Sequence, residues 1–249
     1  MALNVEVLER RSHDGQMEGP ERTPRLLVTW QNSQTRKYTA VGVLESGNGS
    51  YCFRYVDGVD GLPGFSGLLG FEDLKRVYTS DHLFPIFSQR VMMAGRSERP
   101  RLLEALALGP DAEPMEILER SGGHRAGDTL EILPIPDLAG GQTEFTFLAH
   151  GVRHCDGADE ILDTLEPGDV LGLRRQPENP QDSRAVLVTT EGTALGWVPS
   201  PLLELVHALL EAGEPHVTVE RVNPRELGHH LRLLVRLRGS VAGSYSHPW

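Results

Sequence analysis

The stretch from Arg174 to Val188 reads RRQPENPQDSRAVLV and places a polar, proline-framed segment between two apolar runs. Pro177 and Pro180 fix the backbone φ angle and push the residues before them into extended conformations. Asn179 and Asp182 carry short side chains that hydrogen-bond nearby backbone amides and so form turns. The apolar runs on either side predict strands over 169–175 and 185–189. The stretch therefore predicts two strands joined by a rigid loop, which would stand as a rim.

Further short strands surround this pair. Apolar alternation predicts strands over 145–153, 193–198, 216–222 and 231–237, and a short helix over 158–165. A longer helix is expected to begin at Ser200 as its N-cap, with Pro201 in the first position. Its predicted buried face is made by Leu202, Leu205, Val206 and Leu209. Many short strands with one or two helices predict a small barrel.

The first half of the chain shows a different order of elements. Strands are predicted over 26–30, 38–44, 51–56 and 129–133, with a hairpin turn at Asn48-Gly49. Helices are predicted over 83–93, 101–108 and 115–120. The expected core residues are Leu44, Phe53, Phe84, Phe87, Leu103 and Leu106. The fold class is therefore α+β: a small N-terminal sheet with helices, then a small barrel.

This pattern divides the chain into five segments. They are a polar arm over 1–23, a first domain over 24–134, a linker over 135–143, a second domain over 144–239 and a tail over 240–249. Pro134, Pro136 and the pair Gly140-Gly141 mark the linker.

The glycine-rich segment GLPGFSGLLG at 61–70 invites comparison with a phosphate-binding loop. It lacks the GK[ST] ending, and no clear strand–helix context surrounds it. We interpret it as a loop.

Composition narrows the function classes. The formal net charge of −11 argues against general polyanion binding, so any nucleic-acid contact must use a local patch. Only two of the basic residues are lysines, and arginine suits bidentate recognition of phosphate or carboxylate. Cys52 and Cys155 lie far apart and outside any CxxC motif, which disfavours a zinc site or a disulfide framework. No signal peptide and no membrane span are predicted, and we expect a cytoplasmic protein without metal or cofactor.

The heptapeptide HGVRHCD at 150–156 gathers histidine, cysteine and aspartate. On a straight strand, His150 and His154 would share a face about 13 Å apart at a rise of ~3.3 Å per residue, too far for one metal ion. We predict neither a metal site nor a Cys–His nucleophile there. His229-His230 are interpreted as solvated histidines, on opposite strand faces or in a turn.

The second half resembles the HIRAN domain. The matching residues are FLAHGVRH at 147–154, GDVLGLRRQPENPQDSRAVLV at 168–188 and GTALGWVP at 192–199, which together span about residues 144–239. The resemblance implies a partly opened β-barrel related in shape to OB and SH3-like barrels. It also implies a DNA-binding module, because one studied member of the family holds the 3′ end of a single strand.

The same resemblance suggests roles for individual residues. Arg153 would contact the terminal phosphodiester, His154 takes the place of a stacking tyrosine, and Asp182 would accept a hydrogen bond from a free 3′-hydroxyl. Gln181 replaces an aromatic residue of that member. Asn179 is a candidate contact or only a turn former. Trp197 is a stacking face or a core residue, and only one of Arg174 and Arg175 is expected to face a groove because side chains alternate along a strand.

Residues 26–134 resemble the small N-terminal subdomain of the HipA-type Ser/Thr kinases. The residues that carry this are VGVLE at 41–45, SDHLFPIFSQRVMMAGRSERPRLLEALAL at 80–108 and ILERSGGHRAGDTLEILP at 117–134. The kinase core that follows in that family, with its ATP loop and catalytic aspartate, is absent from this sequence. We therefore predict a non-enzymatic protein with no catalytic residues. Its partners would be single-stranded DNA ends or, in the alternative, a separate HipA-type kinase core that it regulates as an antitoxin would.

Overall fold

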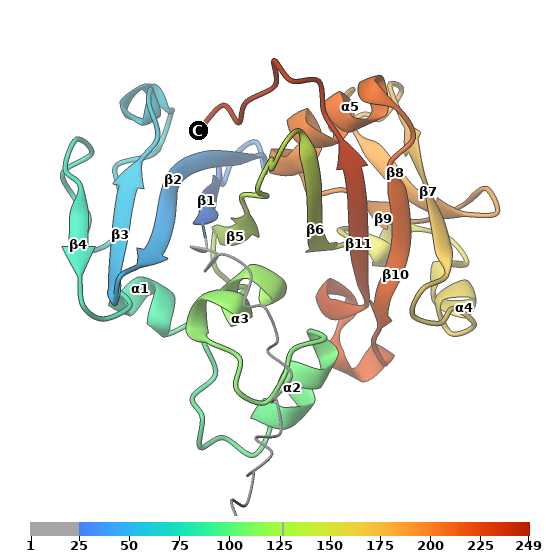
Figure 1. Cartoon of the computed structure of the whole chain (residues 1–249), viewed down its shortest axis with the longest axis horizontal. Coiled ribbons are helices and arrows are strands. Elements are labelled where there is room, and N and C mark those ends of the chain that lie inside the picture. The colour runs from blue at the N-terminus through green and yellow to red at the C-terminus, as the bar shows by residue number, and fades with distance from the viewer. Residues whose placement is uncertain (1–24, 126) are drawn as a thin grey trace, which may run out of the picture.

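The computed structural model describes residues 25–125 and 127–249, which form two antiparallel sheets with few helices (Figure 1). The predicted arm, residues 1–23, lies outside the described residues. The first sheet has the strand order β4-β3-β2-β1-β5, and the second has the order β6-β11-β10-β7-β8-β9. This architecture confirms the predicted α+β class.

The central strands of the first sheet are buried on both faces. Its strands are β1 (Arg25–Gln31), β2 (Tyr38–Gly47), β3 (Ser50–Tyr55), β4 (Tyr78–Ser80) and β5 (Leu130–Pro134). Because side chains alternate along β1, Leu26 and Val28 pack with Phe53 and Phe87 on one face, while Leu27 packs against the second sheet. Of the predicted core residues, only Phe84 is part-exposed, and the others are buried.

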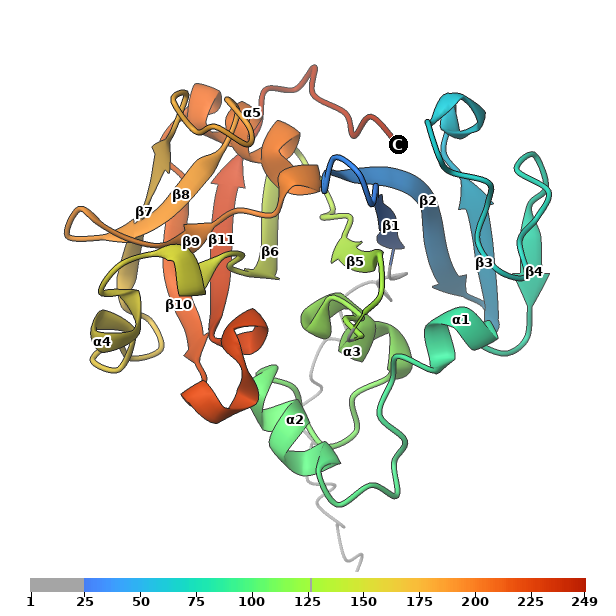
Figure 2. The ribbon, with the colours of Figure 1, turned by 180° about the vertical axis from the view of Figure 1, so that it is seen from behind.

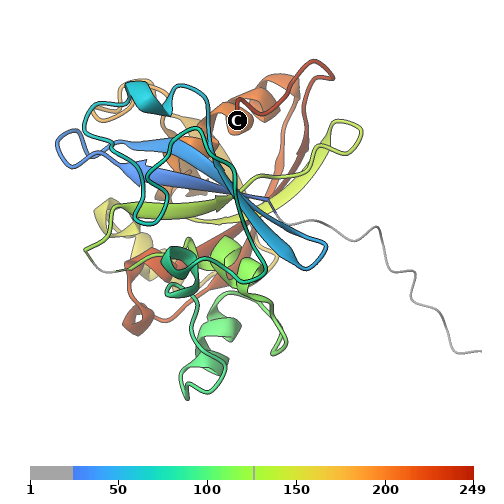
Figure 3. The same ribbon diagram turned by 90° about the vertical axis from the view of Figure 1, so that its left-hand side faces the viewer.

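Three short helices lie beside one another at one end of the first sheet (Figure 3). They are α1 (Pro85–Ser88), α2 (Arg99–Ala105) and α3 (Pro114–Ser121). The prediction of one helix over 83–93 was wrong beyond its first turn. The Arg90 side chain bonds the Ile86 carbonyl that a continuing helix would need, while the Arg90 amide turns to Phe87 instead.

The second sheet curls into an incompletely closed barrel (Figure 2). Its strands are β6 (Gln142–Leu148), β7 (Val170–Arg175), β8 (Val186–Thr190), β9 (Thr193–Trp197), β10 (His216–Val222) and β11 (Leu233–Ser240). The two ends of the sheet, β6 and β9, meet through one isolated bridge between His150 and Trp197, with backbone hydrogen bonds of 2.8 and 2.9 Å. This geometry agrees with the predicted partly open barrel.

Two helices accompany the barrel, α4 (Ala158–Leu162) and α5 (Leu203–Ala212). The predicted apolar face of α5 is buried. The predicted capping role of Ser200 was wrong, because Ser200 opens a single 3-10 turn and Leu202 stands at the N-cap without a side-chain hydrogen bond. Pro201 in that turn supplies the fixed φ angle that the sequence suggested.

The predicted strand over 145–153 ends early, at Leu148. Gly151 adopts a left-handed conformation (φ 66°), which turns the chain out of the strand direction and into a 3-10 turn, η2 (Val152–His154). The straight-strand geometry assumed for His150 and His154 therefore does not hold.

One apolar cluster joins the two sheets. Leu27, Val43 and Leu133 from the first half, together with Ile135 from the predicted linker, pack with the barrel interior. The C-terminal segment folds back onto the connection between the halves, since His247 Nε2 donates a 2.7 Å hydrogen bond to the Pro136 carbonyl. The division into separate domains stays a prediction, but the two halves share a core in this structure.

Candidate nucleic-acid interface

The turn η2 places two basic side chains at the edge of the barrel. Val152 is buried and anchors the turn, while Arg153 and His154 are exposed. The Arg153 guanidinium donates to His154 through Nε, with 3.0 Å to Nε2. The sharp turn at Gly151 is what allows both side chains to project from the barrel edge.

Trp197 is part of the framework that holds this turn. Its indole ring lies so close to Gly151 that a Cβ on Gly151 would stand 2.7 Å from the ring. The indole Nε1 donates a 2.9 Å hydrogen bond to Gln176 Oε1. These two contacts make Trp197 a framework residue of the turn. Because Trp197 is only part-buried, it also keeps some exposed surface.

The loop that follows β7 is organised by side-chain hydrogen bonds, as the sequence suggested. Asn179 Nδ2 donates to the same Gln176 oxygen that Trp197 uses, at 2.8 Å. Asn179 Oδ1 accepts from the amides of Gln181 and Asp182, and Asp182 Oδ1 accepts from the Arg184 amide at 2.9 Å. Both residues therefore act as turn formers, and the Asp182 bond engages one of its two carboxylate oxygens.

The two arginines at the end of β7 diverge. Arg175 reaches Glu211 of α5, with 3.7 Å between Nη2 and Oε1. Arg174 is exposed, and strand alternation directs it to the opposite side. The structure thus groups Arg153, His154 and Trp197 around Gly151 and ties Asn179 to them through Gln176. Arg174 is two strands from Trp197, with Leu187 of β8 between them in register, and among the described residues no hydrogen bond or ion pair joins its side chain to this group.

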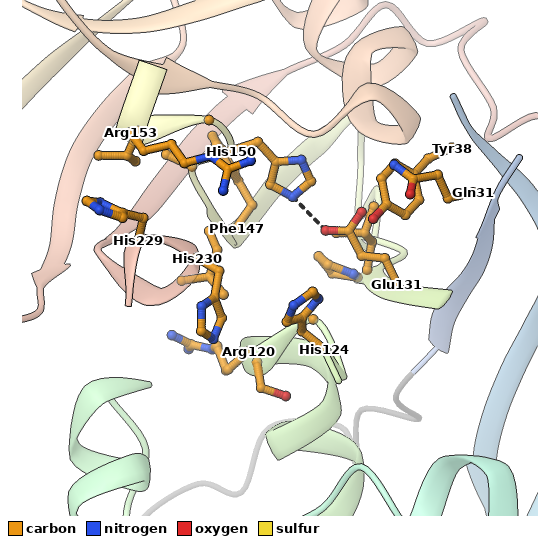
Figure 4. Close-up of a pocket in the computed structure, with 18 of the residues that line it drawn as sticks. Gln31, Tyr38, Arg120, His124, Glu131, Phe147, His150, Arg153, His229 and His230 are labelled. Carbon is orange, nitrogen blue, oxygen red and sulfur yellow. Dashed lines mark hydrogen bonds and ion pairs between the residues drawn. The ribbon is translucent and has the colours of Figure 1, made fainter. Parts of the chain in front are cut away.

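A cavity of about 510 Å³ lies between the two halves, next to η2 (Figure 4). Arg153 and His154 line it from the barrel, together with His229 and His230 of the 3-10 turn η5 (His229–Leu231). The first half contributes Arg120, His124, Glu131, Tyr38 and Gln31, among others. Sequence reasoning missed these first-half residues, because they come from separate segments that only the folded topology brings together.

His150 and Glu131 form an ion pair across the halves at the side of this cavity. His150 Nε2 donates to Glu131 Oε1 at 2.6 Å. Burial lowers the pKa of His150, but the Glu131 carboxylate raises it more, so its pKa is raised overall. Glu131 Oε2 is buried and has no hydrogen-bond partner among the described residues.

A second pair of histidines meets across the cavity. The rings of His124, which follows α3, and His230, in η5, lie 5.0 Å apart between centroids. Burial and then the neighbouring His124 lower the pKa of His230.

Within residues 25–125 and 127–249, no group of three or more His, Cys, Asp or Glu residues is placed to hold a metal ion. Burial, and then Asp156, raise the pKa of the Cys155 thiol, which disfavours the reactive thiolate. Among the described residues, no helix is long and apolar enough to cross a membrane.

The fold and this edge define a small, incompletely closed antiparallel barrel with a cationic turn at its rim. Residues 142–241, which contain the barrel, match the family model of the HIRAN domain. This supports the resemblance predicted for the second half, whereas the resemblance of the first half to HipA-type kinases stays a prediction.

Two solved structures are similar to part of this chain. A protein from Lactobacillus plantarum shares 22% identity over 40% of this chain and 99% of its own, with a TM-score of 0.30. The HIRAN domain of human HLTF shares 15% identity over 42% of this chain and 83% of its own, with a TM-score of 0.31. No curated protein matches the chain by sequence.

Proposed function

We propose that this chain is a non-enzymatic DNA-binding module that holds the free end of a single strand at η2. The observation that carries the proposal is the exposed pair Arg153–His154 on a HIRAN domain, at the rim of a cavity. No carboxylate among the described residues forms an ion pair with Arg153, although the chain carries a net charge of −11. An arginine left unpaired in an acidic protein is available for a phosphate.

Each residue of the group has a distinct task. Arg153 contacts the terminal phosphodiester, and the His154 ring offers a stacking face to the last base. Asp182 accepts a hydrogen bond from the free 3′-hydroxyl and repels a 3′-phosphate, which selects open ends. Trp197, Asn179 and Gln176 hold the two loops that carry these groups.

The test compares labelled single strands that end in a 3′-hydroxyl, end in a 3′-phosphate, or are circular. We expect the 3′-hydroxyl strand to bind best. Arg153→Ala should weaken its binding roughly 10- to 150-fold, which corresponds to the ~1.5–3 kcal/mol of a charge-assisted hydrogen bond. Equal affinity of the unmutated protein for the three strands would overturn end recognition.

A substitution at Asp182 separates the turn from the ligand. Asp182→Asn keeps an Oδ1 acceptor for the Arg184 amide but removes the charge, so the fold should survive. The preference for a 3′-hydroxyl over a 3′-phosphate should then disappear while the salt dependence stays nearly unchanged, because an anion makes no counterion-releasing contact. If Asp182 is only a turn former, Asp182→Asn leaves the preference intact.

The alternative, regulation of a separate HipA-type kinase core, rests on the sequence resemblance of residues 26–134. Its test is co-purification with such a core at micromolar concentration, and failure to associate would count against it. In either case we expect the purified chain to turn over no ATP, and metal-dependent turnover abolished by a point substitution would contradict this.

A further inference from the structure

The cavity beside η2 continues into a second one. This second cavity, of about 870 Å³, lies between α1, α2 and the η5 turn. Ser121, His124 and His230 line both cavities, so the two adjoin at these residues. We call the combined hollow the inter-half groove; it leads from Arg153 at the barrel edge to Arg96 just before α2.

The charge of this groove is opposite to that of the protein. Its lining holds five arginines and three carboxylates, in a chain where 35 acidic residues outnumber 24 basic ones. The arginines are Arg90, Arg96, Arg120, Arg125 and Arg153, and the carboxylates are Glu98, Glu119 and Glu131.

Several of these arginines lack a carboxylate partner. Among the described residues, Arg125 forms no ion pair with an acid and donates only to the Gln89 side chain, at 3.1 Å. Arg96 forms no direct ion pair either, although its charge acts on the nearby Glu98 carboxylate. Arg120 lies 3.6 Å from Glu220, but its buried Nη1 makes no hydrogen bond. By contrast, Arg90 forms a buried ion pair with Asp128, so it stabilises the fold and is not available to a ligand. Unpaired arginines along a concave surface form a favourable path for a polyanion.

The groove also offers faces for bases. Val91, Met92, Met93 and Leu102 line its outer part, and the Met93 side chain is 70% exposed. Methionine adapts its shape and contacts aromatic rings favourably. The imidazole rings at the junction present further flat surfaces. A cationic groove with apolar and ring surfaces fits an unpaired strand, whose phosphates and bases are both accessible.

We propose that a single strand whose end is held at Arg153 runs on through the inter-half groove, where Arg125 and Arg96 of the first half contact its inboard phosphates. This inference rests on the proposed DNA-binding function. It assigns a role to the first half that the HIRAN domain alone does not supply. Binding should therefore strengthen with strand length until the groove is filled.

The test measures affinity as a function of strand length for the full chain. Free-ended oligonucleotides of about 4 to about 16 nucleotides cover the usual span of a single-strand site. In the unmutated protein we expect affinity to rise with length. In Arg96→Glu/Arg125→Glu the rise should be lost, with binding of the longest strand weakened at least tenfold and the shortest changed little. The salt slope for the longest strand should fall by about 0.7 for each contact removed.

Arg101→Glu is the matched control. Arg101 is exposed on α2 and lines neither cavity, so its reversal changes the net charge on the same element without touching the path. It should leave the length dependence intact. Both groove arginines are exposed as well, so the double variant should fold, which circular dichroism checks.

The outcomes separate the two proposals. If no free-ended strand binds at any length, the proposed function fails. If short strands bind but the groove variant keeps the length dependence of the unmutated protein, the function stands and the groove path is wrong. A loss equal in Arg101→Glu and in the groove variant would also overturn the path, because it would reflect overall charge alone.

Discussion

At the scale of single residues, Gly151 connects the fold to the candidate site. Its left-handed conformation creates the η2 turn, and its lack of a side chain leaves room for the Trp197 ring. The sequence shows a glycine between His150 and Val152, but it does not show which ring will lie against it. That contact depends on the bridge between the two ends of the barrel, which brings together residues far apart in sequence.

The first prediction concerns Gly151→Ala. The new Cβ would stand 2.7 Å from the indole ring, so we expect overpacking to lower the free energy of unfolding by about 1–3 kcal/mol. Holding an alanine in the left-handed backbone conformation should cost about 1–2 kcal/mol more. Gly157→Ala is the control, because Gly157 has a similar φ of 73° and nothing within 4 Å of its Cβ position. Urea unfolding measures both, and equal losses would show that the Trp197 contact does not matter.

The second prediction follows from the raised pKa of His150. The free energy that its charged form gains from Glu131 is fully present below the ordinary imidazole pKa and is lost as pH rises through the raised value. Glu131→Gln should therefore cost most near pH 6 and progressively less toward pH 9, taking an ordinary imidazole pKa of about 6.5.

Asp81→Asn provides the comparison for this pH series. His82 Nδ1 lies 2.7 Å from Asp81 Oδ1, a distance similar to that of the first pair, but both side chains are more than four-fifths exposed. Exposed ion pairs contribute little to the free energy of unfolding. A cost of Glu131→Gln that does not change with pH would contradict the assigned ion pair.

At the scale of elements, most strands follow from the sequence because alternation and turn residues are local signals. The hairpin at Asn48-Gly49 forms as predicted, with both residues in the left-handed region. The loop character of residues 61–70 is also confirmed. The short edge strand β4 was missed, because three residues are too few to show alternation. The early end of α1 was missed because it depends on Arg90 bonding Gly123 and Asp128, which lie far along the chain.

Arg232 joins several elements of the barrel, and it carries the third prediction. Its side chain is 1% exposed, pairs with Asp159 in α4 and with Asp163 at the C-cap of that helix, and donates to the Asn223 carbonyl after β10. Arg232→Met should cost about 3 kcal/mol, the lower end of the range for breaking a buried pair, because Asp163 is half exposed and regains water.

The control for Arg232→Met uses the same aspartate. Arg225 also pairs with Asp163, but its side chain is 46% exposed. Arg225→Met should therefore change the stability little. Chemical denaturation of the two variants decides whether burial sets the cost, and equal losses would contradict that interpretation.

At the scale of the whole molecule, the sequence predicted the barrel better than it predicted the site. Arg153, His154 and Trp197 were predicted from the second half alone, through the short local motifs at 147–154 and 192–199, and their role in DNA binding stays a prediction. The cavity beside them also needs Arg120, His124 and Glu131, and no local pattern marks those residues as neighbours of η2. The core shared by the two halves was not predicted, for the same reason. Ile135 lies in the predicted linker and is buried in the shared core.

The last prediction tests whether this shared core makes the chain one folding unit. Leu27, Val43 and Leu133 pack into the barrel core, so unfolding either half would expose apolar surface of the other. We expect one cooperative transition in urea for the full chain.

Two single-tryptophan variants can observe the halves separately. One keeps Trp30 on β1, and the other keeps Trp197 on β9, with the remaining tryptophans changed to Phe. Their fluorescence midpoints should coincide. Leu195→Ala, a substitution in the fully buried barrel interior, should cost about 2–5 kcal/mol and lower the midpoint observed at Trp30 as much as that at Trp197. If Leu195→Ala shifts only the Trp197 midpoint, the halves fold independently, and the inter-half groove would lose the rigid support that a shared core provides.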